Sequence, residues 1–115
     1  MRSDLRLRTK LFAIDVIRAC RGVPRSKEGW VLGRQLIRSG TSVGANYREA
    51  FRARSRAEFI AKMGDCLREL EETAYWLELL VDAEIIPPAP IAAVRQETNE
   101  LTAIFVTVLK RTRET

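Results

Sequence analysis

The residues of this 115-residue chain best suited to covalent chemistry are its two cysteines, Cys20 and Cys66. A cysteine nucleophile needs a neighbouring base, and the chain has no histidine. The same absence removes the usual zinc and di-metal ligand sets, so Glu71, Glu72 and Glu78 are expected on a solvated helix face. We therefore expect no enzyme activity, no catalytic residue, no metal and no cofactor, and we interpret both cysteines as buried free thiols.

A second chemistry is suggested by four arginines that lie within nine residues, Arg48, Arg52, Arg54 and Arg56. The first two share one helix face at a spacing of four, and such like charges repel by roughly 0.2–0.5 kcal/mol in an isolated helix. Phosphates would relieve this repulsion because guanidinium groups bind them through paired hydrogen bonds. The arginines are therefore candidate nucleic-acid-binding residues. The alternative is that they meet the acidic stretch 69–84 across an interface.

Charge is unevenly distributed along the chain, although the net charge is only +5. Residues 1–68 contain 16 Lys and Arg against 6 Asp and Glu, whereas residues 69–109 contain 1 against 8. Such a division is typical either of a basic face for a polyanion or of complementary halves that pair within the fold or between subunits. Composition leaves both interpretations open.

The elements that must position these groups are predicted to be helices, because the apolar residues recur at helical spacing among good helix formers. We expect a first helix over residues 4–21, capped by Ser3, and a last helix over residues 90–111. The first helix has more apolar residues than one core face requires, and Leu11 and Ile14 lie away from that face. This excess predicts a second buried contact for the first helix.

The two central helices carry clearer boundary signals. Ser26 is the predicted cap of the second helix, whose residues 38–46 include two glycines and predict a kink or a close approach to another helix. Ser55 and Glu58 form a predicted capping box at the start of a long third helix. That helix is expected to end near Ile86, before a proline-rich connection.

Together these signals predict one domain over residues 1–115, an all-α antiparallel four-helix bundle with a kinked or broken second helix. No apolar run approaches the roughly 18 residues that a membrane span needs. The first ten residues also lack the apolar stretch of a secretory signal, so we expect a cytoplasmic protein.

Three motifs in their order, residues 35–50, 55–62 and 69–80, resemble a family of small bacterial four-helix bundles. This family is also known as the ribosomal-RNA intervening-sequence protein family. The resemblance implies a non-enzymatic protein that assembles as a ring-like homo-oligomer, with a pentamer as the characteristic form. A related accessory protein of diversity-generating retroelements engages nucleic acid and a reverse transcriptase.

The resemblance also singles out a set of signature positions. In this chain they are Arg38, Ser39, Ser42, Ala45, Asn46, Glu49, Ser55 and Phe59. We interpret them as mainly structural, since short polar side chains can satisfy backbone groups at a helix break. Arg38 and Glu49 are expected to form an interhelical ion pair, because a charge near the core needs a partner. A shared ligand or partner site is the alternative.

The aromatic residues Trp30, Tyr75 and Trp76 could stack on bases, but we expect them to pack in the core or between subunits. The sequence thus predicts a homo-oligomeric bundle, by resemblance a pentamer, that binds RNA or DNA through an arginine-rich surface as an accessory to a ribonucleoprotein. The alternative is a protein-protein interaction scaffold without nucleic-acid binding, in which the charge asymmetry serves assembly.

Overall fold

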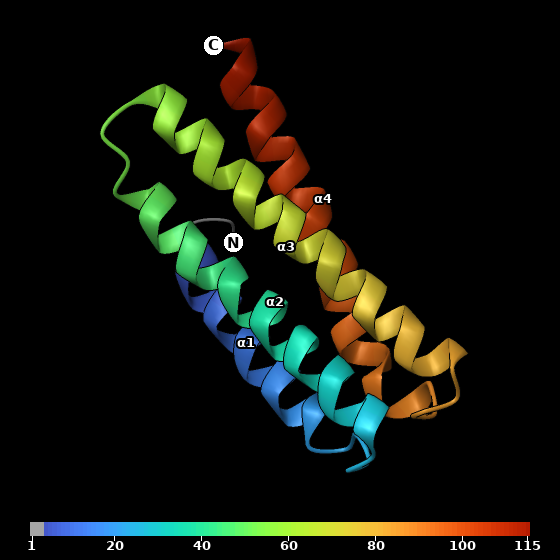
Figure 1. The fold of residues 1–115 in the computed structure, drawn as a ribbon. Coiled ribbons are helices and arrows are strands. Elements are labelled where there is room, and N and C mark those ends of the chain that lie inside the picture. Colours follow the sequence, from blue (N-terminus) through green and yellow to red (C-terminus); the bar gives the residue numbers. More distant parts are fainter. Residues whose placement is uncertain (1–3) are drawn as a thin grey trace.

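A computed structural model describes residues 4–115 of the chain and contains four α-helices (Figure 1). They are α1 (Leu5–Cys20), α2 (Lys27–Phe51), α3 (Arg56–Asp82) and α4 (Ala92–Glu114), with a short 3-10 helix, η2 (Ala89–Ile91), before α4. Residues 4–115 contain no β-strand. The predicted all-α fold is confirmed.

The helices form an elongated antiparallel bundle of 47 × 21 × 21 Å (Figure 1). Each helix packs on the next along the chain, and α4 also contacts α1. The start of α1, the α2–α3 connection and the end of α4 lie toward one end of the bundle (Figure 1). The α1–α2 and α3–α4 connections lie at the opposite end, so the arginines of the α2–α3 connection are near the start of α1 and the end of α4 (Figure 1).

Serine side chains begin the two central helices as predicted. Ser26 Oγ accepts a hydrogen bond from the Gly29 amide at 3.0 Å, and Ser55 Oγ accepts one from the Glu58 amide at 3.0 Å. The Glu58 carboxylate accepts from the amide of Arg54 at 2.7 Å instead of that of Ser55, so the capping box is displaced by one residue. The predicted cap of α1, Ser3, lies outside the described residues.

The predicted break in the second helix is wrong, because α2 is one uninterrupted helix of 25 residues. Its small residues permit close contact with α1 instead. A Cβ atom on Gly40 would lie 2.7 Å from a methyl group of Val16, and one on Gly44 would lie 3.2 Å from Thr9 Oγ1. The residues that predicted either a kink or a close approach therefore serve the close approach.

The helix α3 ends at Asp82, before the predicted Ile86. Glu84 adopts a left-handed backbone conformation with φ of 61°, and its amide bonds the Val81 carbonyl at 2.9 Å. The next amide bonds the Leu80 carbonyl at 3.0 Å, which completes a Schellman motif. The chain thus leaves the helix before it reaches the prolines. After them, α4 begins at Ala92 and continues to Glu114.

Both cysteines are free thiols, as predicted, but only Cys66 has the predicted burial. Cys66 is fully buried with its sulfur 3.5 Å from the Val43 carbonyl, and Cys20 is partly buried with its sulfur 3.6 Å from the Gly33 carbonyl. Burial raises the pKa of Cys66 to about 12 and that of Cys20 to about 11. Such thiols carry almost no thiolate near neutral pH, so they are poor nucleophiles.

Candidate nucleic-acid interface

The four candidate arginines lie on and around the connection between α2 and α3, and all four are exposed. Arg48 and Arg52 lie at the end of α2, Arg54 in the connection and Arg56 at the first position of α3. Within residues 4–115 the side chains of Arg48, Arg52 and Arg54 make no ion pair or hydrogen bond. Three of the four guanidinium groups are thus available to a ligand.

Arg56 has a structural contact that the other three lack. Its Nε and Nη2 atoms donate hydrogen bonds of 3.1 and 2.6 Å to the Thr112 carbonyl in the last turn of α4. The final carbonyls of a helix have no partner within the helix, and a cation is favourable there. Arg56 therefore caps α4 and ties it to the start of α3.

A shallow hollow of about 200 Å³ lies beside the free arginines, lined by Arg6, Arg48, Phe51 and Arg52. The Phe51 ring is 60 % exposed, and the guanidinium carbon of Arg6 lies 5.2 Å from its centroid. No carboxylate lines this hollow. The sequence reasoning missed Arg6 and Phe51. The position of Phe51 between Arg48 and Arg52 was the available signal, whereas the approach of α1 was not visible in the sequence.

The same end of the bundle holds the last turns of α4, which add further exposed cations (Figure 1). We call this surface the arginine end and define it by the exposed residues Arg6, Arg48, Phe51, Arg52, Arg54, Lys110, Arg111 and Arg113. The carboxylate of Glu49 does not neutralise it, because Glu49 pairs with Lys62 at 2.6 Å. The arrangement can bind an extended polyanion and offers one aromatic ring.

The expected ion pair between Arg38 and Glu49 is wrong, since the two residues lie eleven positions apart in the continuous helix α2. Arg38 instead reaches α3, where it pairs with Glu69 at 3.2 Å and with Glu72. Burial lowers the pKa of Arg38. Glu72 and Glu69 raise it through their hydrogen bonds and negative charges, and their effect is larger, so the pKa of Arg38 is raised overall. Within the described chain, Glu69 and Glu72 of the acidic stretch therefore pair with Arg38 and not with the arginines of the α2–α3 connection, whereas a contact of those arginines with the acidic stretch across a subunit interface stays a prediction.

The signature residues Ser39, Ser42 and Phe59 make hydrogen-bond or packing contacts. Ser39 is buried, and Thr73 of α3 donates a hydrogen bond of 2.8 Å to its hydroxyl. Ser42 donates to the Arg38 carbonyl at 2.6 Å, and Phe59 is half-buried against the core. Ala45 is exposed and Asn46 is half-buried. These contacts support a structural role for Ser39, Ser42 and Phe59, whereas Asn46 makes no side-chain hydrogen bond within residues 4–115 and the roles of Ala45 and Asn46 stay predictions.

The three aromatic residues differ in their surroundings. Trp76 packs against the core, and Tyr75 is 54 % exposed with its ring centroid 5.1 Å from that of Trp76. Trp30 is 62 % exposed, so core packing of Trp30 is wrong. Whether Tyr75 and Trp30 pack between subunits stays a prediction.

Two further findings bear on the kind of protein. Among residues 4–115 no group of three or more His, Cys, Asp or Glu side chains is placed to hold a metal ion. In the same part of the chain, no helix is both long enough and apolar enough to cross a membrane.

The fold and the site define a small antiparallel four-helix bundle with an unpaired cationic surface at one end. The family model of the 23S rRNA-intervening sequence proteins matches residues 4–107, and the chain belongs to this family. The chain is also similar to a crystal structure from Bacteroides thetaiotaomicron VPI-5482, of a protein with unknown function from the S23 ribosomal protein family. The two chains are 34 % identical over 91 % of this chain and 97 % of the other, with a TM-score of 0.84. No curated protein matches the chain.

Proposed function

We propose that this protein binds RNA through the arginine end, as a non-enzymatic homo-oligomer in the cytoplasm that assists a ribonucleoprotein. The observation that carries the proposal is the exposure of Arg48, Arg52 and Arg54 without an acidic partner in residues 4–115. The family description, which names intervening sequences of ribosomal RNA, favours RNA over DNA as the polyanion.

The physical basis is electrostatic. Each guanidinium group that neutralises a phosphate releases condensed counterions, which favours binding and makes the affinity fall as salt rises. The exposed ring of Phe51 lines the same hollow as Arg48 and Arg52 and offers a face on which an unpaired base can stack. This combination suits a single strand better than a duplex, whose bases are already stacked.

The oligomeric part of the proposal is supported by the exposed face of α1. Leu7 and Leu11 are 53 % and 50 % exposed, and with Ile14 they form a stripe away from the buried face of the helix. Contiguous exposed apolar residues are typical of an interface between proteins. By resemblance to the family we propose a pentamer.

The test is the variant Arg48→Gln, Arg52→Gln, Arg54→Gln, which removes three charges without touching the Arg56 cap of α4. A matched control, Lys10→Gln, Arg68→Gln, Arg95→Gln, removes three charges elsewhere on the helices. Mobility shifts with single-stranded RNA over a range of salt concentrations should show weaker binding for the first variant only. Its slope of log affinity against log salt should shrink by about 0.7 for each phosphate that the variant no longer neutralises.

Two outcomes would reject this function. If the wild type shows no salt-dependent RNA binding, the arginine end does not bind nucleic acid. If the Arg48, Arg52 and Arg54 variant dissociates the oligomer, these arginines serve assembly. Either result would leave the protein-protein scaffold as the better description, and the exposed stripe of α1 as its binding surface.

A further inference from the structure

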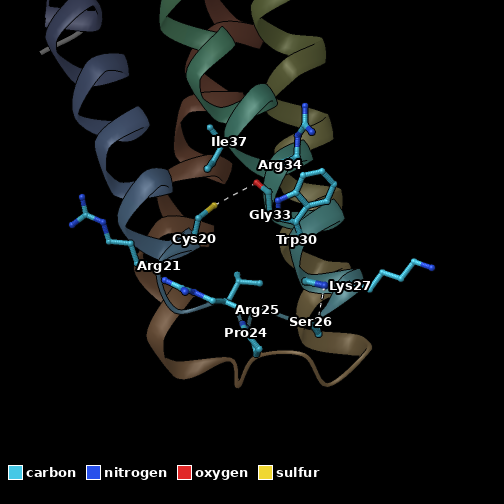
Figure 2. Close-up of a pocket in the computed structure, with 12 residues that line it drawn as sticks. Cys20, Arg21, Pro24, Arg25, Ser26, Lys27, Trp30, Gly33, Arg34 and Ile37 are labelled. Atoms are coloured by element: carbon cyan, nitrogen blue, oxygen red, sulfur yellow. Dashed lines mark hydrogen bonds between the residues drawn. The ribbon is translucent and has the colours of Figure 1, made fainter.

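A second basic site lies at the end of the bundle opposite the arginine end. A cavity of about 780 Å³ opens there between the last turn of α1 and the first turns of α2 (Figure 2). Cys20 and Gly33 lie against each other on the helices that form it, joined by the contact between the Cys20 sulfur and the Gly33 carbonyl (Figure 2). Its volume is within the range of sites that hold a small molecule. We call it the Trp30 cavity, after its most exposed aromatic residue.

The charges around the Trp30 cavity are all positive. Its lining includes Arg21, Arg25, Lys27 and Arg34 and contains no carboxylate. Within residues 4–115 none of these four side chains makes an ion pair. Figure 2 shows Arg21 and Lys27 on opposite sides of the lining residues, with their side chains extending away from each other. Four unneutralised cations around one cavity indicate an anionic ligand.

The other lining residues are apolar or aromatic, which narrows the class of anion. The indole ring of Trp30 is 62 % exposed, and the Arg34 guanidinium carbon lies 4.8 Å from its centroid. Val23 and Ile37 add aliphatic surface. An inorganic anion would gain nothing from an aromatic ring and aliphatic side chains, and an apolar peptide would gain nothing from four cations. A flat aromatic group that carries a phosphate uses both.

We propose that the Trp30 cavity binds a nucleotide, with its base stacked on Trp30 and its phosphate held by Arg25 and Arg21 or Lys27. A free nucleotide and the terminal nucleotide of an RNA strand present this chemistry alike. Binding of a free nucleotide is independent of the function proposed above, whereas binding of a strand end rests on it. Base stacking and charge act together in this site, as they do in single-strand binding proteins.

The experiment uses tryptophan fluorescence in the full-length Trp76→Phe variant. The chain has two tryptophans, so Trp30 is then the only one. Adenosine 5′-monophosphate should quench the fluorescence to saturation, and ribose 5-phosphate, which lacks the base, should bind at least about tenfold more weakly. Circular dichroism checks the fold of the variant. If Trp76→Phe does not fold, calorimetric titration of the wild type against Trp30→Ala gives the same comparison.

Substitutions of the cations and of Trp30 assign the ligand to the cavity. Arg21→Gln with Arg25→Gln should weaken nucleotide binding about tenfold or more, while the control pair Lys10→Gln and Arg68→Gln, two exposed cations outside both basic surfaces, should leave it unchanged. Trp30→Ala should lose the binding, and Trp30→Phe should retain part of it because a smaller ring still stacks. All these side chains are exposed, so the variants should fold.

Oligouridylates with and without a 5′-phosphate show whether the cavity binds a free nucleotide or the terminal nucleotide of an RNA strand. Equal binding of the free nucleotide and the phosphorylated strand identifies the nucleotide unit itself, and binding of the phosphorylated strand alone identifies a strand end. Loss of all RNA mobility shifts with nucleotide binding intact would reject the proposed function and leave the cavity assignment standing. The assignment is overturned if neither ligand quenches Trp30, if ribose 5-phosphate binds as well as the nucleotide, or if the Arg21 and Arg25 variant binds normally.

Discussion

At the scale of single residues, identical arginines have different roles because their neighbours differ. Arg8 of α1 donates to both carboxylate oxygens of Glu97, at 2.7 and 2.8 Å, and so links α1 to α4. Arg56 is fixed to the Thr112 carbonyl. Arg48, by contrast, lies on the surface without a partner in residues 4–115. The sequence identifies the arginines but not which of them are occupied, because occupancy depends on helices distant in the chain.

The two cysteines give a first prediction at this scale. Replacing Cys20 and Cys66 with Ala should lower the free energy of unfolding by about 1 kcal/mol each, and more for the fully buried Cys66. RNA binding should not change, because neither thiol lies at the arginine end. Chemical denaturation and mobility shifts measure the two effects. Loss of binding with unchanged stability would give the thiols a functional role.

The raised pKa of Cys66 adds a pH dependence. The thiol has an ordinary pKa of 9.0, and burial raises its pKa in the folded state to about 12. Between these values the unfolded chain ionises its thiol while the folded protein keeps the proton, so stability falls as pH rises from 9 toward 12. Below pH 9 the thiol has no such effect. The fall should be smaller in Cys66→Ala than in the wild type, as measured by urea unfolding at several pH values. An identical pH profile would contradict the buried thiol.

At the scale of the helices, the starts were more predictable than the ends. Ser26 and Ser55 cap α2 and α3 through local contacts that their own side chains make, so the sequence contains the whole signal. The end of α3 depends on Glu84 in a conformation that usually requires glycine, and no residue type marks it. The close approach of α1 to α2 depends on Val16 and Thr9, which only the folded chain brings to Gly40 and Gly44.

The close approach of α1 and α2 makes Gly40 sensitive to substitution. Gly40→Ala should destabilise the protein by about 1–3 kcal/mol, because the new methyl group would lie 2.7–3.0 Å from the side chain of Val16. Gly64→Ala is the matched control, since nothing lies within 4 Å of its added Cβ, and it should stabilise α3 by roughly 0.5–1 kcal/mol. Thermal unfolding separates the two. A further Val16→Ala change should recover part of the Gly40→Ala loss.

At the end of α3, introducing a glycine should stabilise the protein. Glu84→Gly should stabilise the protein by about 1 kcal/mol, because a left-handed conformation costs a non-glycine residue roughly 1–2 kcal/mol. Glycine also gives the unfolded chain more freedom, which reduces the gain. Denaturant titration of the variant against the wild type measures it. A clear destabilisation would mean that the Glu84 side chain makes a stabilising contact outside the turn.

At the scale of the whole molecule, the antiparallel topology separates two basic surfaces. The arginine end gathers cations from α1, α2 and α4, and the Trp30 cavity gathers others from α2 and the α1–α2 connection. The uneven charge along the sequence predicted either a basic face or pairing between the two halves, but not two separate basic surfaces. Part of the acidic stretch binds Arg38 within the chain, while the other contacts of the acidic half, such as that of Glu97 with Arg8, hold α4 against α1. The cations without such partners are concentrated at the two ends.

The exposed stripe of α1 leads to a prediction about assembly. Leu7 and Leu11 lie one turn apart on the side of α1 opposite its buried face, and a 115-residue bundle has no further interior to cover them. Leu7→Gln with Leu11→Gln should dissociate the proposed oligomer, because each leucine would give up about 1.5–3 kcal/mol of apolar burial in every interface.

The matched control is Val106→Gln on α4, which is 46 % exposed and lies away from the stripe. Light scattering after size exclusion should show the wild type and the control at several times 13.1 kDa and the double variant at 13.1 kDa. A monomeric wild type at micromolar concentration would reject the oligomer, and dissociation by Val106→Gln alone would place the interface on α4 instead of α1.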